Sequence, residues 1–272
     1  MKYLCLIALL SLSVSSVWAQ KKLVQLWETK DLPVPESVLF SPKTNLLYVS
    51  LIDGGGSDKD GKGGVALLNL DGSVKDKNWI TGMDAPKGLA IYKDVLYVAD
   101  ITAVSVIDII SGNEIDCVEV PGAVFLNDVT IDDNGVVYVS DTRTNKIHVL
   151  RDNQPSVFME NVTNVNGLKF IGDYLYALAG PELWKIDRAK KVTVLAKGFE
   201  LGGDGLEPVG KGDFLVTCWG GLIYYVHANG TFDLLLDVRG KMNTADLGFH
   251  PSTNTVYIPT FNNNSVIAYR LE

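Results

Sequence analysis

Residues 127–142 read NDVTIDDNGVVYVSDT, and the plan of this stretch recurs along the chain. A short apolar strand leads into a turn of Asp, Asn and Gly, and a second strand follows in which Val and Tyr alternate. The five other segments are ESVLFSPKTNLLYVSLI (36–52), KGLAIYKDVLYVADI (87–101), NGLKFIGDYLYALAG (166–180), DGLEPVGKGDFLVTCW (204–219) and ADLGFHPSTNTVYIPTF (245–261). By subtraction, the six starts are 51, 40, 39, 38 and 41 residues apart.

Each repeat continues with a third apolar strand and, in most repeats, with a fourth. KIHVLRD (146–152) and PSVFMEN (155–161) are the third and fourth strands of one repeat. Almost no stretch has the periodicity of a helix. Four strands in about 40 residues are typical of a β-propeller blade. The sequence therefore predicts an all-β fold, a six-bladed β-propeller with four strands per blade.

The two ends of the chain complement one another. The sixth repeat stops after its third strand, SVIAYRL (265–271), while the apolar stretch KLVQLWE (22–28) belongs to no repeat. A sheet edge left open is prone to pair with other chains, and ring closure removes it. We therefore expect the N-terminal strand to complete the last blade and to close the ring.

The first residues predict an exported protein. MKYLCLIALLSLSVSSVWAQ (1–20) contains a Lys, an apolar run and a small-residue end, as in a signal peptide over residues 1–19 that is cleaved before Gln20. A single propeller domain is expected over residues 20–272. No later stretch is long and apolar enough to predict a membrane span. The predicted location is periplasmic or secreted.

Charge and cysteine content narrow the partners. The formal net charge of −8 argues against nucleic acid and against an anionic membrane surface, and it suits a cation site. Cys117 and Cys218 both lie in apolar, strand-like runs about a hundred positions apart. We expect two buried free thiols; one disulfide is the alternative in an oxidising compartment.

The first residue of each repeat is a candidate for function. In a propeller the first strand of every blade lines the central channel, so these residues meet at one mouth of the channel. They are Glu36, Lys87, Asn127, Asn166, Asp204 and Ala245.

Four of these residues carry side-chain oxygens that suit a divalent cation. Two carboxylates and two amides, Glu36, Asp204, Asn127 and Asn166, form a hard-oxygen set that favours Ca²⁺, with Mn²⁺ or Mg²⁺ as competitors. No His or Cys is present in the ring, which disfavours zinc. The alternative is that Asn-Gly and Asp-Gly merely form turns. That alternative suits Asn166 and Asp204, but it does not explain Glu36.

The order and spacing of these residues resemble a known family. The motifs PES (35–37), LND (126–128), VNG (165–167) and GDG (203–205) are similar to those of the senescence marker protein, gluconolactonase and luciferin-regenerating family, over the whole mature chain. Diisopropyl fluorophosphatase and the paraoxonases are distant relatives of that family. The resemblance implies a catalytic calcium held by Glu36, Asn166 and Asp204, with Asn127 on the ion or on the substrate. Asp204 would be the base or nucleophile in hydrolysis of a lactone or related ester.

Three positions near the ring have more than one interpretation. Lys87 is a departure from the pattern; its ammonium group either contacts a substrate oxygen or forms a salt bridge with Asp128 or Glu207. Glu207 stands at the offset of a second, structural calcium ligand in the resembling family, but the accompanying His is missing. Trp219 either stacks on a sugar-like substrate or packs on the next blade.

The glycine-rich loop GGGSDKDGKGG (54–64) has the spacing of a phosphate-binding loop. Gly63 follows Lys62 where Ser or Thr is needed, and a β-rich run follows where a helix is needed. No nucleotide site is therefore predicted. In a propeller this segment joins the second and third strands of the first blade, at the end where the inner strands begin. We expect it to cover the metal side as a mobile lid.

No GxSxG motif is present and the three His residues fall outside the predicted mouth, so a Ser-His-Asp hydrolase is unsupported.

Two other classes of function stay open. A binding propeller that keeps calcium only as a structural ion is the main alternative to the hydrolase. An exported or cell-surface interaction module of the same fold is the third possibility.

Overall fold

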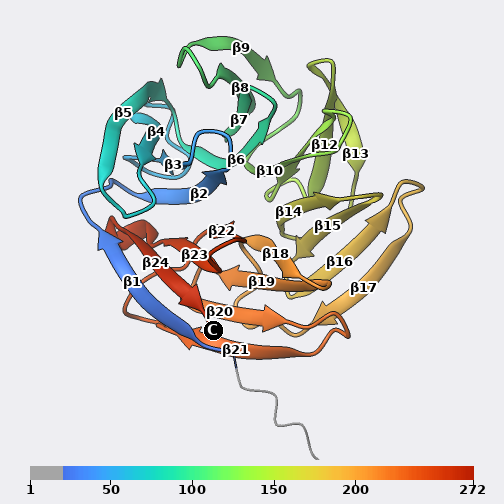
Figure 1. The fold of residues 1–272 in the computed structure, drawn as a ribbon. Helices are drawn as coiled ribbons and strands as arrows, with labels where there is room; N and C mark the ends of the chain where they lie inside the picture. Colours follow the sequence, from blue (N-terminus) through green and yellow to red (C-terminus); the bar gives the residue numbers. More distant parts are fainter. Residues whose placement is uncertain (1–20) are drawn as a thin grey trace, which may run out of the picture.

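The computed structural model describes residues 21–272, which form 24 strands in six four-stranded antiparallel sheets. The sheets stand in a ring around a central channel, and a single short 3-10 helix, η1 (Phe261–Asn263), interrupts the strands of this described part (Figure 1). The predicted six-bladed all-β propeller is confirmed. The predicted signal peptide, residues 1–19, lies outside the described residues.

Each blade is one sheet whose strands follow one another in the chain. Blade 1 contains β2 (Pro35–Ser41), β3 (Leu46–Leu51), β4 (Gly63–Leu68) and β5 (Val74–Met83); blade 2 contains β6 (Pro86–Tyr92), β7 (Val95–Asp100), β8 (Ala103–Asp108) and β9 (Glu114–Glu119). Blade 3 contains β10 (Leu126–Ile131), β11 (Val137–Asp141), β12 (Lys146–Arg151) and β13 (Gln154–Met159); blade 4 contains β14 (Val165–Ile171), β15 (Tyr174–Ala179), β16 (Glu182–Asp187) and β17 (Val192–Lys197). Blade 5 contains β18 (Leu206–Gly210), β19 (Asp213–Cys218), β20 (Leu222–Val226) and β21 (Phe232–Asp237).

The sixth blade joins the two ends of the chain, as predicted. It consists of β22 (Gly248–His250), β23 (Thr255–Pro259), β24 (Val266–Leu271) and, on the outside, β1 (Leu23–Thr29). β1 runs antiparallel to β24, with Leu23 opposite Leu271, and Figure 1 shows the two strands side by side. Trp27 of β1 also donates a hydrogen bond from Nε1 to the carbonyl oxygen of Leu70, at 3.0 Å. The N-terminal strand thus holds both the last blade and the first.

The hydrophobic core lies between neighbouring blades. Leu47 and Val49 of blade 1 pack in one cluster with Tyr257 and Val266 of blade 6. Similar clusters fill the other contacts between blades. Both faces of the second and third strands are buried, which explains their long apolar runs. Among the outermost strands, β5 and β9 expose most of their residues.

A repeated irregularity marks the beginning of the inner strands. In blades 1 to 4 the pairing of the first strand with the second shifts register just after its first residue, for example between Pro35 and Val38. Such a bulge turns the side chains that it contains. Glu36, Lys87, Asn127 and Asn166 all lie inside these bulges. The sequence repeat therefore places them at one end of the channel.

No helix within residues 21–272 is long and apolar enough to cross a membrane.

Cys117 and Cys218 are both free, as expected, and Cys218 is buried. Cys117 is exposed, however, so the expectation of burial was wrong there. It lies on β9, an outermost strand, and the apolar residues around it do not cover it.

Candidate active site

The polar residues that head the repeats are buried at the channel mouth. Glu36, Lys87, Asn127 and Asp204 are 2–6 % exposed, and Asn166 is half-buried. Asp204 lies just before β18, where its backbone N–H donates to the carbonyl oxygen of Thr217 at 2.7 Å. The side chains of Glu36, Lys87, Asn127 and Asp204 are therefore shielded from water, although they belong to none of the hydrophobic clusters. Such burial is costly unless each polar group finds a partner.

The two amides each donate to a protein oxygen. Asn166 Nδ2 donates to Asp204 Oδ1, so the side chains of blades 4 and 5 touch. Asn127 Nδ2 donates to Thr142 Oγ1 at 3.1 Å. These bonds fix the orientation of both amide groups. They leave the two Asn carbonyl oxygens as acceptors that a ligand can use.

The two carboxyl groups each keep one unpartnered oxygen. Within residues 21–272, Glu36 Oε2 and Asp204 Oδ2 are buried and accept no hydrogen bond. Burial, followed by the negative charges of Asp204 and Asp246, raises the pKa of Glu36 well above its usual value. Burial and the charge of Asp246 raise the pKa of Asp204 to about 8. The charge of Asp204 thus makes the ionisation of Glu36 less favourable.

The chemistry of this donor set suits a divalent cation. A cation held by Glu36 and Asp204 would give a partner to both orphaned oxygens and would offset the repulsion between the carboxylates. Oxygen ligands of this kind suit Ca²⁺, Mg²⁺ or Mn²⁺. Within residues 21–272 no three His, Cys, Asp or Glu side chains gather closely enough to hold a metal. Coordination would therefore depend on the amide oxygens of Asn127 and Asn166 and on water.

Lys87 brings a positive charge to the same mouth. Its Nζ donates to the carbonyl oxygen of Ala85 at 2.7 Å and lies 4.5 Å from the centre of the Phe125 ring. Burial lowers the pKa of Lys87 to about 8, against the opposing effect of Glu36. The ammonium is thus held by a carbonyl and an aromatic face, and it lies near enough to Glu36 for the two charges to interact.

The expected salt bridge of Lys87 with Asp128 or Glu207 is not formed. Glu207 Oε1 instead pairs with Lys169 Nζ at 2.6 Å. Asp128 accepts from the backbone N–H groups of Leu168, at 2.6 Å, and of its own successor in the chain. That alternative for Lys87 is therefore wrong. Because Glu207 is already paired with an ammonium group, it is also a poor ligand for a second calcium.

The glycine-rich loop occupies the expected place. It joins β3 to β4, and Leu51 at the end of β3 pairs with Pro35, so the loop emerges at the candidate mouth. Ser57 accepts a hydrogen bond from Arg143 of blade 3 at 2.8 Å, and Lys59 donates to Thr102 of blade 2 at 2.9 Å. The loop thus reaches across two neighbouring blades. β4 begins at Gly63, inside the glycine-rich stretch, so a strand and not a helix follows Lys62.

Trp219 lies on the rim, in the turn between β19 and β20. Its ring meets Phe261 of blade 6 edge to face, with 5.4 Å between the ring centres. It remains 45 % exposed. The packing on the next blade is therefore present, and the exposed part of the ring is free for a ligand.

Two carboxyl groups one residue deeper in the channel, a buried one on Asp128 and a half-buried one on Asp246, were not predicted as site residues from the sequence. Asp128 is 7 % exposed, and Asp246 accepts from Ser37 Oγ at 2.5 Å and from the backbone of Leu247 at 2.7 Å. Burial raises the pKa of both carboxyls, that of Asp246 to about 6. Asp246 influences the pKa of both Glu36 and Asp204, so it belongs to the electrostatics of the mouth.

A signal for these two residues was present in the repeats. The second residues of the six repeats are Ser37, Gly88, Asp128, Gly167, Gly205 and Asp246. A Cβ atom on Gly88 would lie 2.6 Å from Asp128 Oδ1, and one on Gly205 would lie 2.5 Å from Asp246 Oδ1. Gly in one blade thus makes room for the Asp of the next. An alternation of Gly and Asp at a repeat position indicates this packing.

The histidines take no part in the mouth. His148 is buried in β12, and His227 Nε2 lies 2.8 Å from Asp233 Oδ2. His250 is the last residue of the inner strand β22, at the end away from the candidate mouth. A Ser-His-Asp arrangement at the mouth therefore has no candidate base, as the sequence suggested.

Comparisons with known proteins identify the fold. No protein-family model matches the sequence, and no curated protein matches it either. A solved structure of streptogramin B lyase has a TM-score of 0.69 at 9 % identity, covering 95 % of this chain and 100 % of the other. A catalytically inactive form of virginiamycin B lyase from Staphylococcus aureus, solved with quinupristin, has a TM-score of 0.65 at 13 % identity, covering 93 % and 99 %. A protein described as the "putative gluconolactonase" has a TM-score of 0.69 at 15 % identity, covering 93 % of each chain. At such identities the likeness establishes the propeller fold.

Proposed function

We propose that the protein is an enzyme, a metal-dependent hydrolase of a lactone or related ester, similar in its site to gluconolactonases. The observation that carries the proposal is the pair of buried, unpartnered carboxyl oxygens, Glu36 Oε2 and Asp204 Oδ2, at one mouth of the channel. Strongly shifted pKa values and unsatisfied buried groups are concentrated at functional sites. The gluconolactonase-like structure among the similar propellers supports the same reaction class.

In this proposal Glu36, Asn127, Asn166 and Asp204 hold the cation, with Ca²⁺ as the first candidate and Mn²⁺ or Mg²⁺ as alternatives. When bound, the cation supplies Lewis-acid polarisation of the substrate carbonyl. Asn166 holds Asp204 Oδ1 by a hydrogen bond, so the second oxygen of that carboxylate is oriented toward the site. Asn127 donates from Nδ2 to Thr142, so its Oδ1 can contact the cation or the substrate.

The chain's own groups account for the proton transfer and the positioning. Asp204 accepts the proton of the attacking water, or attacks the carbonyl itself. Lys87 has two further N–H groups beside its bond to Ala85, and one of them can donate to a substrate oxygen. The exposed part of Trp219 forms an apolar wall at the rim. The loop between β3 and β4 limits the access of water from the side of blades 2 and 3.

The metal and the reaction are tested together. The mature protein is purified, its metal content is measured, and it is assayed on a panel of lactones and aryl esters with and without a chelator. Glu36→Gln and Asp204→Asn are compared with Asp76→Asn, a carboxylate on the exposed strand β5. We expect a bound divalent cation, turnover that the chelator removes, and a loss on the order of 100-fold in kcat/KM only in the two mouth variants. A metal-free protein whose melting is the same in all variants would refute the site.

Two further readouts separate the competing functions. Hydrolysis incorporates one oxygen atom from H₂¹⁸O into the acid product, whereas elimination by a lyase incorporates none. The similar structures that are named lyases make this comparison necessary. A cation that raises Tm without turnover of any compound in the panel would instead favour the binding propeller.

We also propose that the protein is exported after cleavage before Gln20. N-terminal sequencing of the protein recovered from the periplasm or medium tests this, and a cytoplasmic chain that retains Met1 would contradict it.

A further inference from the structure

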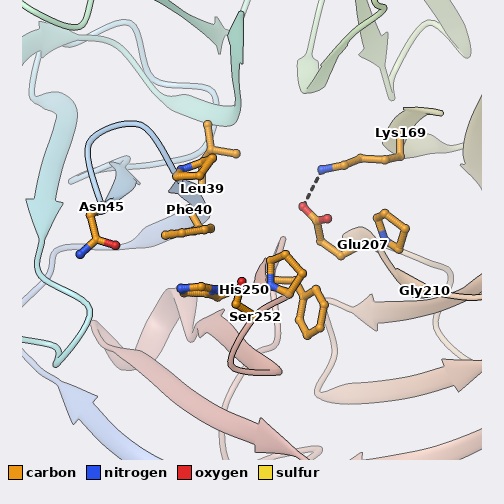
Figure 2. A pocket seen from close by; sticks show the side chains of 12 residues that line it. Leu39, Phe40, Asn45, Lys169, Glu207, Gly210, His250 and Ser252 are labelled. Carbon is orange, nitrogen blue, oxygen red and sulfur yellow. Dashed lines mark hydrogen bonds and ion pairs between the residues drawn. The ribbon is translucent and has the colours of Figure 1, made fainter. Parts of the chain in front are cut away.

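A pocket of about 680 Å³ opens toward the other end of the channel, and Figure 2 shows the side chains that line it. It is bounded by the turns that follow β2, β18 and β22. Since the candidate active site lies where these strands begin, the two sites do not share a single lining residue. A pocket of this volume has the size of a small-molecule site.

The inner wall of the pocket carries an isolated ion pair. Lys169 Nζ lies 2.6 Å from Glu207 Oε1, and Figure 2 shows this pair facing the pocket. At the same repeat position the other blades have Leu39, Ala90, Thr130 and Gly248, so the architecture of a blade does not need a charge there. A buried ion pair contributes little to stability compared with apolar residues of the same size. Its presence therefore calls for another explanation.

Both members of the pair have hydrogen-bonding capacity left. The ammonium of Lys169 has two further N–H donors, and within residues 21–272 Glu207 Oε2 receives no hydrogen bond. The two side chains remain 29 % and 13 % exposed to the pocket. One donor and one acceptor thus stand side by side on the same wall.

The opposite wall contains two aromatic rings. The rings of Phe40 and His250 are stacked, with 4.0 Å between their centres and 14° between their planes. Figure 2 shows the stack across the pocket from the ion pair. His250 Nδ1 is buried and has no hydrogen-bond partner within the described part of the chain. Phe249, Pro208 and Pro251 complete an apolar surround.

The ion pair on the wall disfavours an anionic ligand. Glu207 Oε1 already lies 2.6 Å from Lys169 Nζ, so the positive charge is matched by a carboxyl group of the protein itself. A second anion at this wall would meet the repulsion of that carboxylate. A neutral molecule avoids both this repulsion and the cost of burying another charge.

We propose that this pocket is a second binding site, for a small, neutral, planar ring that carries a cyclic amide. A cyclic amide is held in the cis form, so its N–H and C=O point out from the same edge. The N–H would donate to Glu207 Oε2 and the C=O would accept from Lys169 Nζ. The flat remainder of the ring would lie against the wall that contains Phe40 and His250.

The probe for this site is 2-quinolone, a planar cyclic amide, and its control is N-methyl-2-quinolone, which lacks the N–H donor. Binding to the mature protein is measured by ligand-observed NMR titration. We expect saturable binding of 2-quinolone and binding of the N-methyl compound at least about tenfold weaker, the factor that about 1.4 kcal/mol supplies. Equal binding of the two compounds, or no binding of 2-quinolone, would overturn the proposal.

The variants locate the binding. Lys169→Met combined with Glu207→Leu replaces the ion pair by apolar side chains of similar size, a change that buried pairs generally tolerate. We expect this folded double variant to lose the preference for 2-quinolone over its N-methyl form. Glu36→Gln, at the other mouth, should bind both compounds as the unchanged protein does. A double variant with an unaltered preference would refute the site whether or not the proposed hydrolase activity exists, and lactone turnover tests that activity separately.

Discussion

At the scale of single residues, the energetics of the candidate mouth depend on carboxyl groups that the protein buries without full hydrogen bonding. Among the residues that the structure describes, Glu36 and Asp204 each have an oxygen without a hydrogen-bond partner, and the charge of Asp204 raises the cost of ionising Glu36. Lys87 offsets part of this negative charge. The mouth is therefore strained electrostatically when it holds no cation, and this strain can be measured.

The first prediction concerns pH. The pKa of Asp204 is raised to about 8 and that of Asp246 to about 6, so both bind protons more tightly in the folded chain than in the unfolded one. Their contribution to stability is therefore full below pH about 4 and is lost as pH rises through each folded pKa. Lys87 is charged in both states below pH about 8, so it adds no slope in that window.

We expect Asp204→Asn to gain stability relative to the unchanged protein as pH rises from about 5 to about 8, in the presence of a chelator. The measurement is the free energy of unfolding in guanidinium chloride at several pH values. The difference between the two proteins reports the titration of Asp204 together with its effect on Glu36. Parallel curves for the two proteins would show that Asp204 titrates normally.

The second prediction concerns Lys87. Replacing it by Met removes a positive charge from beside Glu36 while keeping much of the side-chain volume. We expect the dissociation constant for Ca²⁺ to fall about tenfold, because an ammonium and a divalent cation repel one another. Isothermal titration at fixed pH and ionic strength measures this. Lys59→Met, a change in the exposed loop, is the control, and unchanged affinity in Lys87→Met would place the cation elsewhere.

At the scale of strands and loops, two aspartates connect blades across the channel. Asp128 accepts from Leu168 of the next blade and packs against Gly88 of the preceding one. Asp246 does the same between Ser37 of blade 1 and Gly205 of blade 5. Each aspartate thus joins three consecutive blades, and together they involve all six.

The third prediction separates the hydrogen bonds of Asp246 from its charge. Asp246→Ala leaves the Ser37 hydroxyl and the Leu247 N–H without their acceptor, which costs roughly 1–3 kcal/mol. Asp246→Asn keeps an acceptor and removes a charge that burial and Glu207 disfavour. We therefore expect the free energy of unfolding of the Asn variant to equal that of the unchanged protein at pH about 8. At the same pH, the Ala variant should be less stable than both. Equal losses in both variants, measured by chemical unfolding, would show that the charge itself is needed.

The sequence was informative where chemistry and repeat position coincide. Glu36, Asn127, Asn166 and Asp204 could be predicted to share one end of the channel because each heads a repeat. The partners of Lys87 could not be predicted, since the choice between a carbonyl, an aromatic ring and a carboxylate depends on side-chain packing. The Lys169–Glu207 pair was missed for a similar reason: only the ring geometry brings the fourth residues of neighbouring repeats together.

At the scale of the whole molecule, closure of the ring depends on β1. This strand pairs with β24 along its length, and the Trp27 ring lies 5.8 Å from that of Tyr257. The prediction of closure from sequence succeeded because residues 22–28 were apolar and had no place in any repeat. The first strand is thus as much a part of the fold as any complete blade.

The fourth prediction is that a chain beginning at Asp31 folds poorly. Without β1 the edge of β24 is exposed, and an open edge invites pairing with other molecules. We expect Tm to fall by about 10 °C or more, which corresponds to the order of 4 kcal/mol for a chain of this size, and oligomers to form in size-exclusion chromatography. A chain beginning at Lys21 is the control. A monomer with unchanged Tm after removal of β1 would mean that blade 6 is stable with three strands.

The pairing of β1 with β24 also determines when the ring can close as the polypeptide is synthesised. β1 has its partner in β24, the last strand of the propeller to be made. Until β24 has been synthesised, β1 has no strand to pair with and the ring of sheets has a gap. Ring closure is therefore a late step in the folding of a chain that emerges from the ribosome.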